Sequence, residues 1–192
     1  MLRRLYDWTL ELADTPHALW ALAFVAFIES SVFPIPPHLM VVPMVLAAPH
    51  RAWLIALVCT LASVAGGMLG YWIGAELFDS VGRPVLEFYG KDEKFEVFSA
   101  QFNEYGAWAV LFAGMTPFPY KVITITSGAT GLDFTVFMVA SLLARGFIFF
   151  LLAGILWKFG PPVKEFVEKR FALVTTAAFA LILGGFALVR YL

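Results

Sequence analysis

Two long apolar stretches of this chain are interrupted by prolines, and this feature most limits how the chain can fold. They cover residues 17–49 and 106–131. Proline removes a backbone donor and disfavours helix in the residue before it. Broken backbone at the depth of a bilayer persists only where protein or water satisfies it. We therefore interpret each stretch as a re-entrant hairpin, with two half-helices joined by a proline turn. The interrupting residues are Pro34, Pro36, Pro37 and Pro43 in the first stretch, and Pro117, Pro119, Gly128 and Gly131 in the second.

The composition places these stretches in a membrane. The 192 residues are 61% hydrophobic and 14% charged, with a mean hydropathy of +0.83. Soluble domains have about 45–50% apolar and about 25% charged residues. Three uninterrupted apolar segments, residues 52–78, 134–157 and 171–192, approach or exceed the roughly 20 residues that a bilayer requires. The sequence predicts an all-α polytopic membrane protein with about three spanning helices.

The two interrupted stretches resemble each other in sequence. The four residues 33–36 align with residues 116–119, and an apolar helix follows each at the same spacing. Each half is then a hairpin plus one spanning helix. Because that helix crosses once, the second hairpin enters from the opposite face, which gives two opposed hairpins in an inverted repeat. Transporters with such repeats place their site at the midplane, between broken helices. The alternative is a chance match of two Pro-x-Pro motifs.

A single membrane domain over residues 1–192 follows from this pattern. Residues 1–16 carry apolar side chains on one helical face and are predicted to form an interfacial helix, with a frayed polar terminus as the alternative. Lysines and arginines near the spans favour an N-terminus on the cytoplasmic side. The remaining segments are repeat one at 17–78, a surface helix at 79–105, repeat two at 106–157, and a loop with the C-terminal spanning helix at 158–192.

Three charged residues fall where hydropathy places the bilayer: Glu29, Lys121 and Arg145. A charge at the centre of a membrane helix costs about 2.5–3.5 kcal/mol on insertion scales. Such residues therefore face a protein interior or a water-filled cavity. They predict a polar pathway or a binding site inside the membrane.

The two cations favour an anion site. Lys121 follows the second proline turn, and His38 occupies the matching position after the first. Half-helix ends with a nearby cation attract anions, and Arg145 adds a bidentate clamp. Thr116 and Tyr120 flank the second turn and either donate to a ligand or satisfy freed backbone groups. The structural alternatives are that Lys121 snorkels to the interface and that His38 is hydrogen-bonded within its turn.

Glu29 has two open roles. A desolvated carboxyl can exchange protons near neutral pH, which suits a proton-coupling residue. Alternatively, Glu29 pairs permanently with Lys121 or Arg145 and holds the hairpins together.

Enzyme, metal and cofactor signals are weak. The sequence has no Gly-x-Ser-x-Gly elbow, no P-loop and no His-Glu-x-x-His motif. Its single cysteine, Cys59, lies in an apolar run, and no Cys/His cluster has metal-ligand spacing. The net charge of −1 gives no argument for nucleic-acid binding. We expect no enzyme activity, no metal and no cofactor, with the proton motive force as the energy source if transport is coupled.

At these motifs the chain resembles the DedA family, whose shared core is called the VTT domain. The resemblance rests on Glu29 followed by residues 33–37, the glycine run at residues 66–74, and Tyr105-Gly106 leading into Pro117, Lys121 and Gly128. It implies opposed re-entrant hairpins and transport of polyprenyl-phosphate carriers or phospholipids across a bacterial inner membrane, often coupled to protons.

The chain also departs from the better-studied members. Gly67 and apolar residues around Val41 stand where those members carry acids, and Met115 and Lys121 stand where they carry arginines. Arg145 resembles a more divergent branch.

We therefore expect a flippase or scramblase of the inner membrane for a phosphate-bearing lipid, with membrane lipids as partners. A membrane scaffold or assembly factor and a small-anion transporter are the alternatives. An uncoupled scramblase and a homo-oligomeric state stay open.

Overall fold

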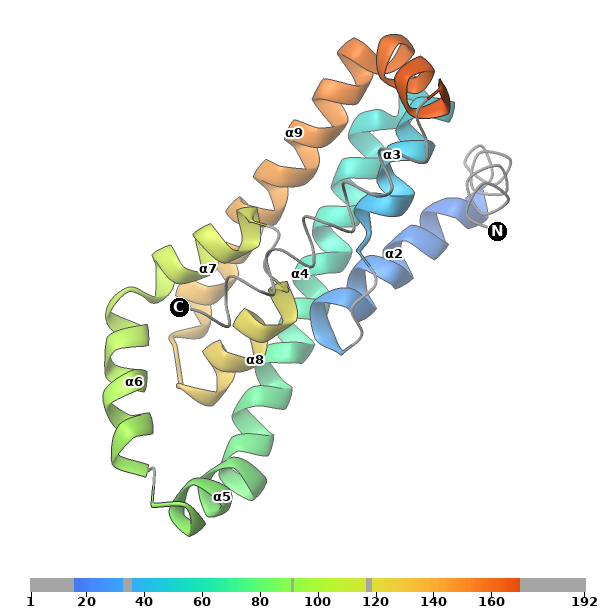
Figure 1. The fold of residues 1–192 in the computed structure, drawn as a ribbon. Helices are drawn as coiled ribbons and strands as arrows, with labels where there is room; N and C mark the ends of the chain where they lie inside the picture. Colours follow the sequence, from blue (N-terminus) through green and yellow to red (C-terminus); the bar gives the residue numbers. More distant parts are fainter. Residues whose placement is uncertain (1–15, 33–35, 91, 117–118, 170–192) are drawn as a thin grey trace.

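The computed structural model describes residues 16–32, 36–90, 92–116 and 119–169, and over these residues it is helical with connecting turns (Figure 1). The helix predicted for residues 1–16 and the span predicted for 171–192 lie outside the described residues, apart from Pro16. The first half contains α2 (Pro16–Ser31), α3 (His38–Ala47), a 3₁₀ turn (Pro49–Arg51) and α4 (Ala52–Leu77). The second half contains a π-helical turn (Phe78–Gly82), α5 (Arg83–Phe88), α6 (Asp92–Glu104), α7 (Gly106–Met115), α8 (Tyr120–Ala129) and α9 (Phe134–Lys169).

Two of the three predicted spanning helices lie within the described residues. The segments Pro49–Gly82 and Phe134–Gly160 are long and apolar enough to cross a membrane. They contain α4 and most of α9. Together with the shorter apolar helices, they support a membrane location.

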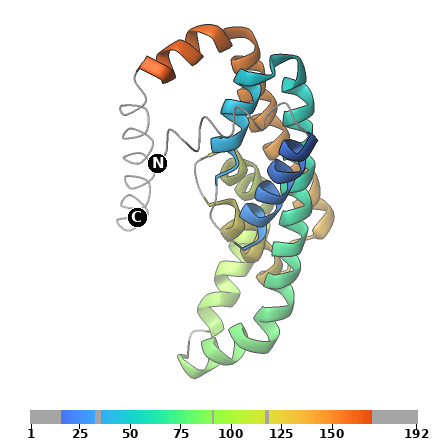
Figure 2. The ribbon, with the colours of Figure 1, turned by 90° about the vertical axis from the view of Figure 1, so that its right-hand side faces the viewer.

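Two elements differ from their predicted boundaries. Helix α9 continues to Lys169, although a loop was expected from residue 158. Pro161 and Pro162 do not end it, because a helix can continue past proline with a change of direction, which Figure 2 shows near this end of α9. In place of one surface helix over 79–105, α5 and α6 are separated by a turn at Gly90, whose φ of 61° favours glycine.

The proline turns divide both interrupted stretches into pairs of short helices. The first break separates α2 from α3, and the second separates α7 from α8. The arms of each pair pack on different long helices. Helix α2 packs on α4 and α7 on α9, whereas α3 packs mainly on α9 and α8 mainly on α4. In Figure 1 the first pair lies towards the end of α4 that begins at Ala52, and the second towards the opposite end.

Glycines on one face of α4 allow the short helices to approach its backbone. A Cβ added at Gly66 would overlap the carbonyl group of Phe27 in α2, and one added at Gly74 would overlap that of Ile125 in α8. The contact with α8 is reciprocal, because a Cβ at Gly128 would overlap the carbonyl of Tyr71. Such small-residue contacts are a common way for membrane helices to pack.

Replacing Gly66 by alanine should therefore destabilise the protein. The added methyl group meets backbone, so α2 must move, although alanine favours helix by about 1 kcal/mol over glycine. Gly146→Ala is the matched control, because its added Cβ would meet only Thr60 Cγ2, at 3.9 Å. Thermal unfolding in detergent should give a lower midpoint for Gly66→Ala and an equal or higher midpoint for Gly146→Ala. Equal midpoints for both variants would contradict the close approach of α2 and α4.

The buried apolar residues form two clusters. One joins α2, α3, α4 and α9 and includes Leu22, Cys59 and Phe149. The other joins α7 and α9 and includes Val110 and Phe137. Along α9, Arg145 lies between the part that packs in the second cluster, around Phe137, and the part that packs in the first, around Phe149.

Candidate functional site

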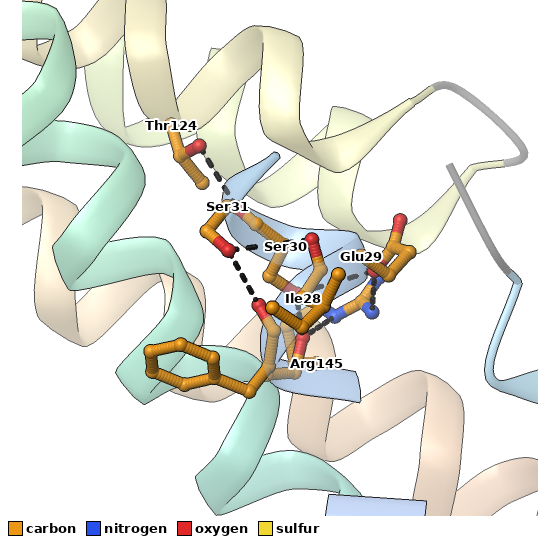
Figure 3. A network of polar contacts seen from close by, with 8 residues as sticks. Ile28, Glu29, Ser30, Ser31, Thr124 and Arg145 are labelled. Atoms are coloured by element: carbon orange, nitrogen blue, oxygen red, sulfur yellow. Dashed lines mark hydrogen bonds and ion pairs between the residues drawn. The ribbon is translucent and has the colours of Figure 1, made fainter. Parts of the chain in front are cut away.

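A buried ion pair joins α2 to α9. Arg145 Nη2 lies 3.0 Å from Glu29 Oε2, and the two side chains are 5% and 13% exposed (Figure 3). Glu29 stands in the last turn of α2, just before the first proline turn, and Arg145 lies within the apolar part of α9. The structure thus pairs Glu29 with Arg145, one of the two partners that the sequence left open.

Two serines complete a closed ring of hydrogen bonds around this pair. Arg145 Nε donates to Ser63 Oγ at 2.6 Å, and Ser63 Oγ lies 2.6 Å from Ser30 Oγ. The Ser30 hydroxyl donates to Glu29 Oε2 at 3.2 Å. Since Ser63 accepts from Arg145 and Ser30 donates to Glu29, the proton between the serines belongs to Ser63. Charge-assisted bonds of this kind are roughly twice as strong as neutral ones.

Two aromatic rings contact the guanidinium of Arg145. Arg145 Cζ lies 4.6 Å from the ring centroid of Tyr120 and 4.7 Å from that of Phe149. Desolvated cation–π contacts contribute about 2 kcal/mol or more. The His38 ring packs on Phe149, with the two ring centroids 5.3 Å apart. Arg145 therefore has contacts on α4, α8 and its own helix that do not depend on Glu29.

The network lies near the middle of the long helices. At about 1.5 Å per helical residue, Ser63 is about 17 Å along α4 from Ala52 and about 21 Å from Leu77. On the same basis, Arg145 is about 17 Å from Phe134 and about 23 Å from Gly160. Charges at this depth are costly unless paired, and here they are.

The end of α2 and the first turns of α8 are joined by hydrogen bonds. Lys121 Nζ donates to the carbonyl of Val32 at 3.3 Å, and Thr124 Oγ1 donates to the carbonyl of Ser30 at 3.1 Å. Figure 3 shows Thr124 reaching the end of α2. Lys121 is partly exposed, and no acidic side chain within the described ranges forms an ion pair with it. A second cation is thus bonded to the end of α2, three residues beyond Glu29 in the chain, without a counter-charge from the described part of the chain.

Of the predicted site residues, Thr116 stands apart. It is exposed, and its hydroxyl donates to the carbonyl of Ala113 at 3.3 Å, so it satisfies the end of α7. The other predicted residues are linked to the ion pair or to the helix that carries Glu29. Tyr120 contacts Arg145, Lys121 is bonded to the end of α2, and His38 packs on Phe149, which also contacts Arg145. No group of three potential metal ligands is found among the described residues.

The sequence reasoning missed Ser30, Ser63 and Phe149. A signal for Ser63 was present, because it lies three and four residues before Gly66 and Gly67 and therefore shares the helical face on which α4 is closely approached. The indication for Phe149 was weaker, because the sequence shows only that it lies one helical turn after Arg145.

Apolar helices that can cross a bilayer, with a paired charge between them, define a helical membrane protein. A family model described as the VTT domain matches residues 33–158. The chain belongs to this family, the DedA family, whose members are generally membrane proteins of transporter type and are not known as enzymes.

Two relatives are similar over most of their length. An uncharacterised protein of Haemophilus influenzae is 33% identical over 168 residues, which cover 85% of this chain and 87% of the relative. An uncharacterised protein of Histophilus somni is 34% identical with the same coverage. No solved structure matches the chain.

Proposed function

We propose that this protein is a lipid transporter, a flippase or scramblase, which moves a phosphate-bearing lipid between the leaflets of a bacterial inner membrane. The observation that carries the proposal is the buried Glu29–Arg145 pair near the middle of the long helices, with Lys121 bonded to the end of α2, the helix that carries Glu29. A polyprenyl phosphate or a phospholipid has the anionic group that these cations would bind.

Opposed re-entrant hairpins would give such a site access to both faces. The packing supports this arrangement, because α2 and α7 each pack on the long helix of their own half, while α3 and α8 pack mainly on that of the other half. An inverted two-fold relation between the halves would produce this exchange. The contacts of Lys121 and Thr124 in α8 with the end of α2 are also what a midplane site between broken helices requires.

The contacts of Arg145 suggest how a phosphate could enter the network. Ser63, Tyr120 and Phe149 hold the guanidinium without the help of Glu29. A phosphate oxygen can therefore replace the Glu29 carboxylate while Arg145 stays in place. Lys121 would add a second positive charge beside the same anion. In this proposal, the Glu29 carboxylate occupies the position that the phosphate of the substrate would take.

The main alternative is a membrane scaffold, and the closed ring of hydrogen bonds favours it. The ring pairs the Glu29 carboxylate with the Arg145 guanidinium and closes through the two serines, so it can join the helices without a ligand. Under this alternative, Lys121 contributes little beyond its bond to Val32. Under the transport proposal, Lys121 is essential.

Replacing Lys121 by glutamine should distinguish the two. Because Lys121 is partly exposed and its described contact is a carbonyl, we expect the variant to fold as wild type. Transport of a phosphate-bearing lipid should fall by about tenfold or more, since a desolvated charged contact contributes about 1.5–3 kcal/mol. Proteoliposomes with a labelled lipid and a membrane-impermeant quencher would measure the rate.

The matched control is Lys94→Gln, which removes an exposed lysine of α6 far from the network in the chain. It should transport at the wild-type rate. If wild-type protein moves the lipid but Lys121→Gln is as fast as this control, the anion site at Lys121 is wrong. If wild-type protein moves no phosphate-bearing lipid at all, the scaffold is the better account.

A further inference from the structure

A second feature lies at the other end of α4, where the apolar span gives way to charged helices. A cavity of about 490 Å³ opens between the end of α4, the π-helical turn, α5, α6 and the end of α8. Its wall includes Phe78, Asp79, Arg83, Phe95, Glu96 and Ser99. Asp79 is about 24 Å along the helix from Ser63, so this cavity is separate from the Glu29–Arg145 network.

The cavity combines an aromatic wall with charges of both signs. The rings of Phe78 and Phe95 stack with centroids 4.3 Å apart. Arg83 lies 5.8 Å from the Phe78 ring and 3.4 Å from Asp79, in an ion pair that is mostly exposed. Such an exposed pair contributes little and can exchange partners readily.

The balance of charge in the cavity is negative. Asp79 and Glu96 bring two carboxylates against the single guanidinium of Arg83. The last residues of α8, Gly128 and Ala129, also line the cavity, and a helix C-terminus carries partial negative charge. The Ser99 hydroxyl, whose oxygen is buried in the cavity wall, has no hydrogen-bond partner within the described part of the chain.

We propose that this cavity binds the headgroup of a zwitterionic phospholipid whose charged ends are a phosphate and an ammonium. The phosphate meets Arg83, and the ammonium meets Asp79 and Glu96 beside the end of α8. The stacked rings of Phe78 and Phe95 cover the start of the acyl chains, and aromatic faces also attract ammonium groups. A lipid whose headgroup is only anionic would face two carboxylates without an ammonium to pair with them. The site does not depend on transport through the midplane.

The test uses full-length protein and two lipids, phosphatidylethanolamine and phosphatidylglycerol. Protein from mixed vesicles with equal amounts of both is released in mild detergent, and native mass spectrometry counts the lipids that it retains. Wild-type protein should retain more phosphatidylethanolamine. In Asp79→Asn/Glu96→Gln this preference should fall about fivefold, the effect of losing exposed charge contacts of about 1 kcal/mol.

The control is Glu93→Gln/Glu104→Gln, which removes the same charge from exposed positions of α6 outside the cavity. It should keep the wild-type preference. In a second variant, Ser99→Phe should fill the cavity and reduce retention of phosphatidylethanolamine. If the cavity double variant does not fold, the single Glu96→Gln variant is tested for the same loss of preference. Equal retention of both lipids by wild type, or equal changes in the cavity variant and its control, would overturn the proposal.

Discussion

Replacing Arg145 by alanine should reduce the free energy of unfolding by about 3–5 kcal/mol, because it leaves the buried Glu29 carboxylate without its cation. The loss also removes the hydrogen bond to Ser63 and the contacts with the rings of Tyr120 and Phe149. This is the largest stability effect that we expect from a single side chain of the site. Unfolding by denaturant in mixed micelles would measure it.

Arg83→Ala is a control of the same chemistry. Arg83 also pairs with an acid and also lies near a phenylalanine ring, but its side chain and that of Asp79 are 60% and 75% exposed. Exposed pairs contribute about 0.2–1 kcal/mol, so this variant should remain close to wild type. A comparable loss in both variants would show that burial of the Glu29–Arg145 pair does not decide its contribution.

A double variant separates the charge from the packing. Glu29→Gln removes the carboxylate that Arg145→Ala leaves unpaired, so Glu29→Gln/Arg145→Ala should recover a large part of the lost stability. The part that is not recovered measures the contacts of Arg145 with Ser63 and the two rings. If the double variant is less stable than Arg145→Ala, an unpaired carboxylate is not the source of the loss.

The sequence was sufficient to predict the two main helix breaks but not every interruption, because Pro43, which was expected to interrupt the first stretch, lies inside α3. Proline acts locally, so Pro36, Pro37 and Pro119 predicted where the short helices part. Hydropathy likewise placed Glu29 and Arg145 where a charged side chain should face a protein interior, and the structure has both side chains largely buried. These features depend on residue type and on the immediate neighbours.

The partner of each charge could not be predicted in the same way. Whether Glu29 meets Arg145 or Lys121 depends on the rotation of α9 and α8 about their axes, which is set by tertiary packing. Close packing at glycines such as Gly66 and Gly74 helps to fix that rotation. Ser63 was missed for the same reason, since a serine in an apolar helix gains meaning only when its facing helix is known. The course of α9 past Pro161 also depends on its surroundings rather than on proline alone.

Replacing Glu29 by glutamine should abolish the response of transport to a pH gradient, if transport is coupled to protons. In the resting structure, Arg145 and the Ser30 hydroxyl both stabilise the Glu29 carboxylate. When a lipid phosphate takes Arg145, the Glu29 carboxylate loses its cation and keeps only the Ser30 hydrogen bond. In the coupled model, Glu29 takes up a proton as the phosphate binds, with no second acid required.

The Glu29→Gln side chain imitates the protonated acid and can still accept the Ser30 hydrogen bond, while Arg145 keeps Ser63 and two rings. The variant should therefore retain lipid but transport it at the same rate with and without an imposed pH gradient. Glu93→Gln, on the exposed side of α6, should respond as wild type does. Proteoliposomes with a pH step across the membrane and a headgroup-labelled lipid would measure all three proteins. If wild-type transport itself ignores the gradient, coupling through Glu29 is wrong and the protein works as a scramblase, with Glu29 serving only to balance Arg145 between transport events.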